Sequence, residues 1–175
     1  MKLNVLKENI IDIIKEEQVK LGYRKETIRL YYPLASLNTL LGTQLDHKNM
    51  LDCLNSYFGE NKDIFGDVDV SYKGDRFCLC LSDKASEYVH NNTEQSGFLY
   101  DFINTIGKHG VTIEELLDQF KHYSDDVHFE KMENEDFDYL IYFENGIPDS
   151  YRYCITEEGH HMIYHRYTKA DYEEL

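Results

Sequence analysis

The hydrophobic residues of the first forty positions predict a helix, a strand and a second helix. Leu6, Ile10 and Ile14 recur at four-residue intervals between charged residues, which is typical of an amphipathic helix, here ending near Gly22. The β-branched and aromatic segment 27–32 then predicts a short strand closed by Pro33. A second helix is expected over residues 34–41, because Gly42 follows it.

The next segment predicts a third helix, a β-hairpin and a fourth helix. Asp46 is a good N-cap residue for a helix over 47–58, with Leu45 and Met50 placed as a hydrophobic staple. The apolar period then changes from 3.6 to 2 across residues 68–81, on both sides of the turn at 73–75, which indicates a hairpin. A capped short helix is expected over 82–89, before a polar linker at 91–97.

The second half of the chain predicts a similar order of elements. A helix is expected over 98–106, and Thr112 with Glu115 forms the capping box of another over 113–120. A further helix is expected over 124–133, then a hairpin of strands 139–143 and 151–155, then a capped helix over 156–164. The sequence thus predicts an α+β protein with two units, residues 1–92 and 97–175.

Two segments suggest that these units are related. Residues 77–85 and 151–159 share an aromatic strand, a Cys before the last apolar residue, a hydroxyl cap and an acidic first turn. The ending Thr156-Glu157-Glu158-Gly159 resembles the last strand and following helix of winged-helix regulators of the multiple-antibiotic-resistance and PadR types. The resemblance implies a tandem winged-helix fold, with a β-hairpin wing in each half.

Residues 14–18 and 21–34 carry a second resemblance. They are similar to the opening of a bacterial family known only as a domain of unknown function. This resemblance implies no activity, substrate or site.

Charge separates the two halves of the chain. The net charge is −15, with 12 basic and 15 acidic residues in 1–95 but 6 and 18 in 96–175. Because binding to nucleic acid or anionic lipid depends on cations, the second half is not expected to bind DNA, and no membrane is expected as a partner. No apolar run is long enough for a membrane helix and no signal peptide is recognised, so the expected compartment is the cytoplasm.

Cysteine usage agrees with that compartment. Four cysteines occur outside any C-x-x-C or zinc-type pattern, so they are expected to be reduced and to behave as small core residues: Cys53, Cys78, Cys80 and Cys154.

Cations gather around the first helix-to-strand connection, interleaved with tyrosines. They are Lys20, Arg24, Lys25 and Arg29, and Lys48 of the third helix could join them at a phosphate or an acidic partner. The alternative is an ordinary solvated face, partly neutralised by neighbouring glutamates. Both interpretations stay open on the sequence.

Candidate chemistry is sparse. In the expected final helix, Glu157, His161 and His165 would share one face next to His160, which is a possible ligand spacing but equally a polar face. The sequence contains no phosphate-cradling glycine loop, nucleophile elbow or zinc-protease motif. We therefore predict no catalytic residues, no metal and no cofactor.

Two hypotheses for function remain. The first is a non-catalytic interaction or regulatory module whose acidic second unit binds a protein partner or another copy of the chain. The second is a transcriptional regulator that reads DNA with its first unit alone, through the helix at 47–58 and the wing at 73–75.

Overall fold

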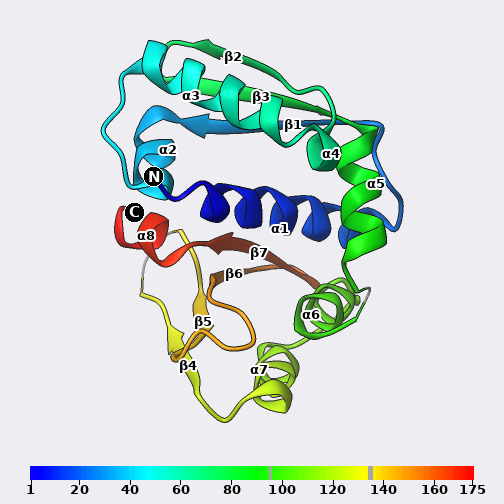
Figure 1. Cartoon of the computed structure of the whole chain (residues 1–175). Coiled ribbons are helices and arrows are strands. Elements are labelled where there is room, and N and C mark those ends of the chain that lie inside the picture. Colours follow the sequence, from blue (N-terminus) through cyan, green and yellow to red (C-terminus); the bar gives the residue numbers. More distant parts are fainter. Residues whose placement is uncertain (95, 134–135) are drawn as a thin grey trace. The chain divides into compact units, whose positions relative to one another are not determined.

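The computed structural model describes residues 1–94, 96–133 and 136–175. The chain forms two compact units, Met1–Glu94 and Gln95–Leu175 (Figure 1). Each unit contains helices and an antiparallel sheet, so the predicted α+β class is confirmed. None of the helices in the described ranges combines the length and the hydropathy that crossing a bilayer requires.

The first unit follows the predicted order of elements, with one short helix added. Gly22 ends the first helix in a left-handed conformation with φ of 71°, and Asp46 caps the third by accepting a hydrogen bond from the Asn49 backbone N–H. The elements are α1 (Leu3–Leu21), β1 (Thr27–Pro33), α2 (Leu34–Leu41), α3 (His47–Glu60), α4 (Lys62–Phe65), β2 (Asp69–Lys73), β3 (Arg76–Ser82) and α5 (Asp83–Asn92).

The sheet of this unit has the strand order β1-β3-β2 and buries one face. Ile28 and Leu30 of β1, and Phe77 and Leu79 of β3, lie in a core shared with apolar residues of the surrounding helices. Because successive strand residues point to opposite faces, the residues between them lie on an outer face, away from that core.

The second unit places two helices before a four-stranded meander. Its sheet has the order β4-β5-β6-β7, and the predicted capping box is present, with Thr112 and Glu115 each accepting from the other's backbone N–H. The elements are α6 (Phe98–Ile106), α7 (Ile113–Tyr123), β4 (Val127–Lys131), β5 (Tyr139–Phe143), β6 (Arg152–Glu158), β7 (His161–Tyr167) and α8 (Lys169–Glu173).

Aromatic rings join these helices to the sheet. Phe98 of α6 lies 4.7 Å from Phe120 of α7 and 4.9 Å from Phe143 of β5, between ring centroids, in edge-to-face contacts. Phe102 contacts Tyr153 of β6 in the same way at 4.7 Å. Such pairs add about 0.5–1.5 kcal/mol each beyond the burial of their area.

Two predicted helices of the second unit are wrong. The segment Ser124–Glu133 contains strand β4, because Val127 and Phe129 alternate with polar residues and pair with β5. The segment Thr156–Tyr164 spans the end of β6 and the start of β7. Glu158 pairs with His161 across a two-residue loop that starts with Gly159 at φ of 61°, as in the hairpin turns that require glycine first.

The predicted internal repeat is therefore not confirmed. Residues 77–85 form a strand followed by a helix, whereas residues 151–159 run along a strand into a hairpin turn. The hydroxyl and acidic residues stand at the start of α5 in the first unit, whereas their counterparts lie within β6 in the second. The two units differ in their order of elements, and the predicted tandem winged-helix fold is not confirmed.

A buried polar network closes one end of the second sheet. Asp149 accepts hydrogen bonds of 2.8 Å from the Tyr151 backbone N–H and from the Tyr153 hydroxyl. The Arg166 side chain is 3 % exposed; its Nη1 lies 3.6 Å from the Asp149 carboxylate, and its guanidinium lies over the Tyr151 ring. Burial, followed by the charge of Asp149, holds the pKa of Tyr153 well above its usual value.

This network predicts that a single substitution at Asp149 strongly lowers the stability of the protein. Asp149→Asn keeps the shape of the side chain but removes the charge beside the buried Arg166, so we expect the free energy of unfolding to fall by about 3 kcal/mol. Urea denaturation followed by tyrosine fluorescence measures the change. The matched control is Asp118→Asn on the exposed face of α7, expected to cost less than about 0.5 kcal/mol. Equal stability of the two variants would contradict the prediction.

Candidate interaction surfaces

The predicted cations near the first connection lie beside carboxylates. Lys20 pairs with Glu16 at 2.9 Å on α1, and Lys25 pairs with Glu17 at 2.5 Å. The hydrogen bond and charge of Glu17 raise the pKa of Lys25 above its ordinary value. Arg24 is exposed in the loop between α1 and β1.

Lys48 lies at the other end of the sheet from these residues. The His47 ring, next to Lys48 at the start of α3, lies 5.3 Å from the Tyr72 ring and its Nε2 is 3.3 Å from Asp75, so this end of α3 lies at the hairpin turn. Thr27, by contrast, pairs with Ser82, and the seven residues of β1 extend about 20 Å between the two ends. The structure therefore does not bring the predicted set Lys20, Arg24, Lys25, Arg29 and Lys48 together.

The outer face of the first sheet carries the predicted Arg29 together with two cations that the sequence prediction missed, Lys73 and Arg76. Arg29 and Tyr31 of β1 project there, and the pairing places Cys80 and Cys78 of β3 directly opposite them. Arg76 and Lys73 pair with each other at the hairpin end of the same face. We call this set the outer sheet face; its members, with the remaining cross-strand neighbours, are Arg29, Tyr31, Asp69, Ser71, Lys73, Arg76, Cys78 and Cys80.

Two cysteines on this face differ from the prediction of core cysteines. Cys154 is buried, but Cys78, Cys80 and also Cys53 are half-buried, and all four are free thiols. Alternation along β3 was the signal that could have placed Cys78 and Cys80 outward, because Phe77, Leu79 and Leu81 occupy the inner positions.

A cavity of about 320 Å³ opens in the second unit, between the start of α7 and the β6–β7 turn. The Gly110 backbone N–H donates to the His160 carbonyl at 2.8 Å, which ties the loop before α7 to the turn. The Tyr139 hydroxyl donates to Glu157 at 2.9 Å within the lining. This hydrogen bond, then burial and the charges of Glu157, Asp138 and Glu114, raise the pKa of Tyr139. The carboxylates of Glu114 and Glu157 therefore belong to the lining of this cavity.

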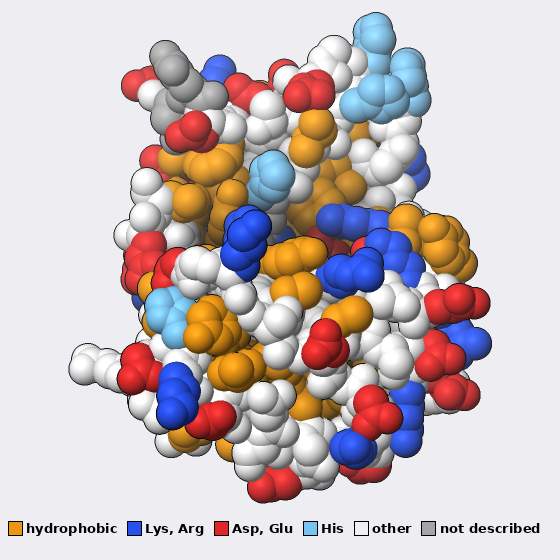
Figure 2. Space-filling view, turned by 90° about the horizontal axis from the view of Figure 1, so that it is seen from above, with side chains coloured by type: hydrophobic (Ala, Val, Ile, Leu, Met, Phe, Trp, Pro, Cys, Tyr) orange, Lys and Arg blue, Asp and Glu red, His pale blue; other side chains and the backbone are white. Residues whose placement is uncertain are grey.

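Histidines gather at the rim of this cavity. The His109 ring lies 5.2 Å from the rings of both His160 and His161. In Figure 2, some histidine side chains group at one corner of the face shown, and others lie singly elsewhere on it.

The metal-ligand spacing considered for Glu157, His161 and His165 assumed a helix, but these residues lie on strands β6 and β7. Glu157 pairs with Met162 and Glu158 with His161, so Glu157 and His161 project to opposite faces of the sheet. Among residues 1–94, 96–133 and 136–175, no group of three or more His, Cys, Asp or Glu side chains is arranged to hold a metal ion.

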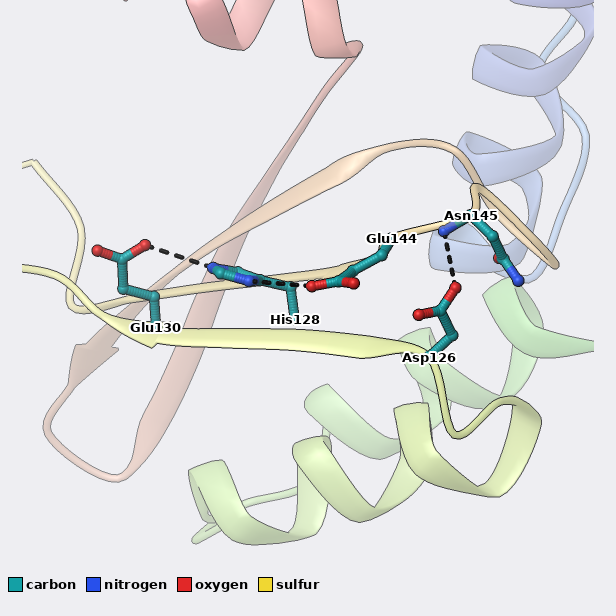
Figure 3. Close-up of polar contacts among 5 residues, drawn as sticks. All are labelled: Asp126, His128, Glu130, Glu144 and Asn145. Atoms are coloured by element: carbon teal, nitrogen blue, oxygen red, sulfur yellow. Dashed lines mark hydrogen bonds and ion pairs between the residues drawn. The ribbon is translucent and has the colours of Figure 1, made fainter.

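A histidine on strand β4 lies between two carboxylates (Figure 3). His128 Nε2 is 3.4 Å from Glu130 and its Nδ1 is 3.6 Å from Glu144. Nearby, Asp126 accepts from the Asn145 backbone N–H at 3.0 Å. The His128 ring also stacks on Tyr142 at 4.6 Å. These contacts join β4 to β5 and to the turn after it, which gives them a structural role at the sheet edge.

Comparison with known families places the chain. It belongs to a family described as a domain of unknown function, E. rectale gene description (DUF3877), whose model matches residues 3–175. The predicted membership of an uncharacterised bacterial family is confirmed. Comparison with curated proteins and with solved structures found no match.

The cysteines predict a clear order of reactivity. Burial raises the pKa of Cys154 to about 11, so near neutral pH it is almost entirely the unreactive thiol. At about pH 8 we expect iodoacetamide to modify the half-buried Cys78 and Cys80 well before Cys154, as measured by peptide mass spectrometry. In denaturant all four should react alike. Modification of Cys154 at the rate of Cys78 in the folded protein would contradict the assignment.

Proposed function

We propose that this protein is a non-catalytic interaction module whose acidic second unit binds a basic surface of a partner protein. The observation that carries the proposal is the concentration of charge, with 18 acidic and 6 basic residues in 96–175. A surface of one sign speeds encounters with partners of the other sign and excludes those of its own.

The cavity beside α7 offers a place where such a partner would anchor. Glu114 and Glu157 lie in its lining beside the Tyr139 ring, and a lysine or arginine side chain prefers carboxylates and an aromatic face. A cation entering this cavity would lie near the carboxylates of Glu114 and Glu157. Ion pairs at the exposed rim of an interface contribute little binding free energy, whereas an ion pair inside a cavity contributes more.

A fluorescent basic peptide tests this proposal. We expect a peptide of alternating lysine, arginine and serine to bind the full chain, and its acidic counterpart not to bind. The double variant Glu114→Gln, Glu157→Gln should weaken binding about thirtyfold, because it removes two charged contacts of about 1 kcal/mol each. Fluorescence anisotropy at several salt concentrations measures the affinities.

The matched control removes the same charge elsewhere in the second unit. The double variant Glu130→Gln, Glu144→Gln should weaken binding less than about threefold, because salt screens the effect of charges that lie far from the cavity. An equal loss in both double variants would assign the binding to overall charge and reject the cavity as its anchor. Absence of binding at low salt, together with a monomeric mass by light scattering, would reject the interaction module altogether, including self-association.

A second candidate function is DNA binding by the first unit. Apart from the short helix α4, the order helix, strand, helix, helix, hairpin, with strands arranged β1-β3-β2, favours it, because this is the arrangement of a winged-helix unit. On that reading Lys48, Lys73 and Arg76 at the hairpin end would contact phosphates. Lys20, Arg24 and Lys25 would not, since they lie at the opposite end of the sheet.

Two triple variants with the same loss of charge separate these cases. If the first unit binds DNA as a winged helix, an electrophoretic shift should be lost in the first triple variant, Lys48→Ala, Lys73→Ala, Arg76→Ala. The same shift should remain in the second triple variant, Lys20→Ala, Arg24→Ala, Lys25→Ala. Because the interaction module does not use DNA, we expect no shift of genomic fragments at about 50 mM salt, where phosphate contacts are strong. A shift that only the first triple variant removes would establish the second candidate instead.

A further inference from the structure

The outer sheet face holds two thiols in a fixed relation that the proposed interaction does not use. Cys78 and Cys80 are separated by one residue on β3, and β3 is the central strand, paired on both sides by β1 and β2. Leu79 between them is fully buried on the inner face. Both thiols therefore project to the outer face, half-buried and free.

The spacing of these thiols disfavours a disulfide. Alternate residues of an extended strand lie about 6.7 Å apart, which is at the upper limit of the Cα separations that disulfides accept. Closing that bond would require β3 to shorten, although its backbone is held by pairing with both neighbours.

The same spacing suits an ion held between two sulfurs. With a metal–sulfur bond of about 2.3 Å, as in thiolate sites, sulfurs on opposite sides of one ion lie about 4.6 Å apart. Each side chain then has to lean by about 1 Å toward the other, which rotation about χ1 provides without moving the backbone. Two-coordinate binding therefore fits where a disulfide does not.

The residues around the thiols decide which ion this would be. Zinc takes four ligands, and among the described residues no third His, Cys, Asp or Glu completes such a group. A soft monovalent ion such as Cu(I) prefers thiolates and accepts two of them. The resulting complex carries one negative charge, and Arg29 opposite Cys80 and Arg76 two residues before Cys78 place positive charge beside it.

We propose that Cys78 and Cys80 form a two-coordinate site for a soft monovalent ion of the Cu(I) type on the outer sheet face. Binding is not a redox step: the ion enters as Cu⁺, both sulfurs bind as thiolates, and any proton they carry passes to water. Tyr31 opposite Cys78, and Ser71 and Asp69 on the other side, are the remaining neighbours of the thiols across the strands.

Anaerobic titration of the full chain with Cu(I), against a competing Cu(I) chelator, tests the site. We expect one ion per chain, with an ultraviolet thiolate-to-copper band, and a loss of affinity of at least tenfold in Cys78→Ser and in Cys80→Ser, because each removes one of two ligands. The double variant Cys78→Ser, Cys80→Ser should bind no copper at that chelator level. Cys78→Ala with Cys80→Ala repeats the measurement with apolar replacements, and circular dichroism confirms the fold of each variant.

Another sulfur pair in the chain provides the control. The Cys53 thiol lies 3.3 Å from the Met1 thioether, so Cys53→Ser removes a soft ligand elsewhere and should leave the titration unchanged. The proposal is overturned if the double variant binds copper as the wild type does, or if Cys53→Ser alone removes the binding. It is also overturned if the ion joins two chains, as size-exclusion chromatography would reveal, or if the wild type binds none.

Discussion

The burial of one face of each sheet is the constraint on which the rest of this structure depends. In the first unit it directs Ile28, Leu30, Phe77 and Leu79 into the core and so sends every intervening residue outward. A shift of one residue in the pairing of β1 with β3 would exchange these sets, burying Arg29 and exposing Leu30, at a cost of several kcal/mol for the charge alone. The composition of the outer sheet face is a consequence of the core.

The second unit obeys the same constraint with different partners. Its aromatic residues cover one face of the meander and hold α6 and α7 against it, while Asp149 and Arg166 complete that packing at one end with a buried charge pair. The charge that cannot be paired in this way lies on the surface. This is why a unit with a well-packed interior still carries most of the negative charge of the chain.

Local signals in the sequence predicted the first unit well and the second unit partly. Gly22, Asp46 and the Thr112–Glu115 capping box are chemical markers of helix ends that act without tertiary context, and each is where it was expected. The segments 124–133 and 156–164 failed because hydroxyl and acidic residues next to apolar ones suit a helix start and an antiparallel strand alike, and pairing with β5 and β6 decided the outcome. For the candidate site, the distribution of charge along the sequence identified the acidic unit. The sequence could not show that Tyr139, Glu114 and Glu157, which are far apart along the chain, line one cavity.

The position of His47 links two parts of the first unit mechanically. Its ring lies against both Tyr72 and Phe77, on the two strands of the hairpin, while its backbone forms the first residue of α3. A displacement of the hairpin tip would therefore disturb the ring contacts at the start of α3.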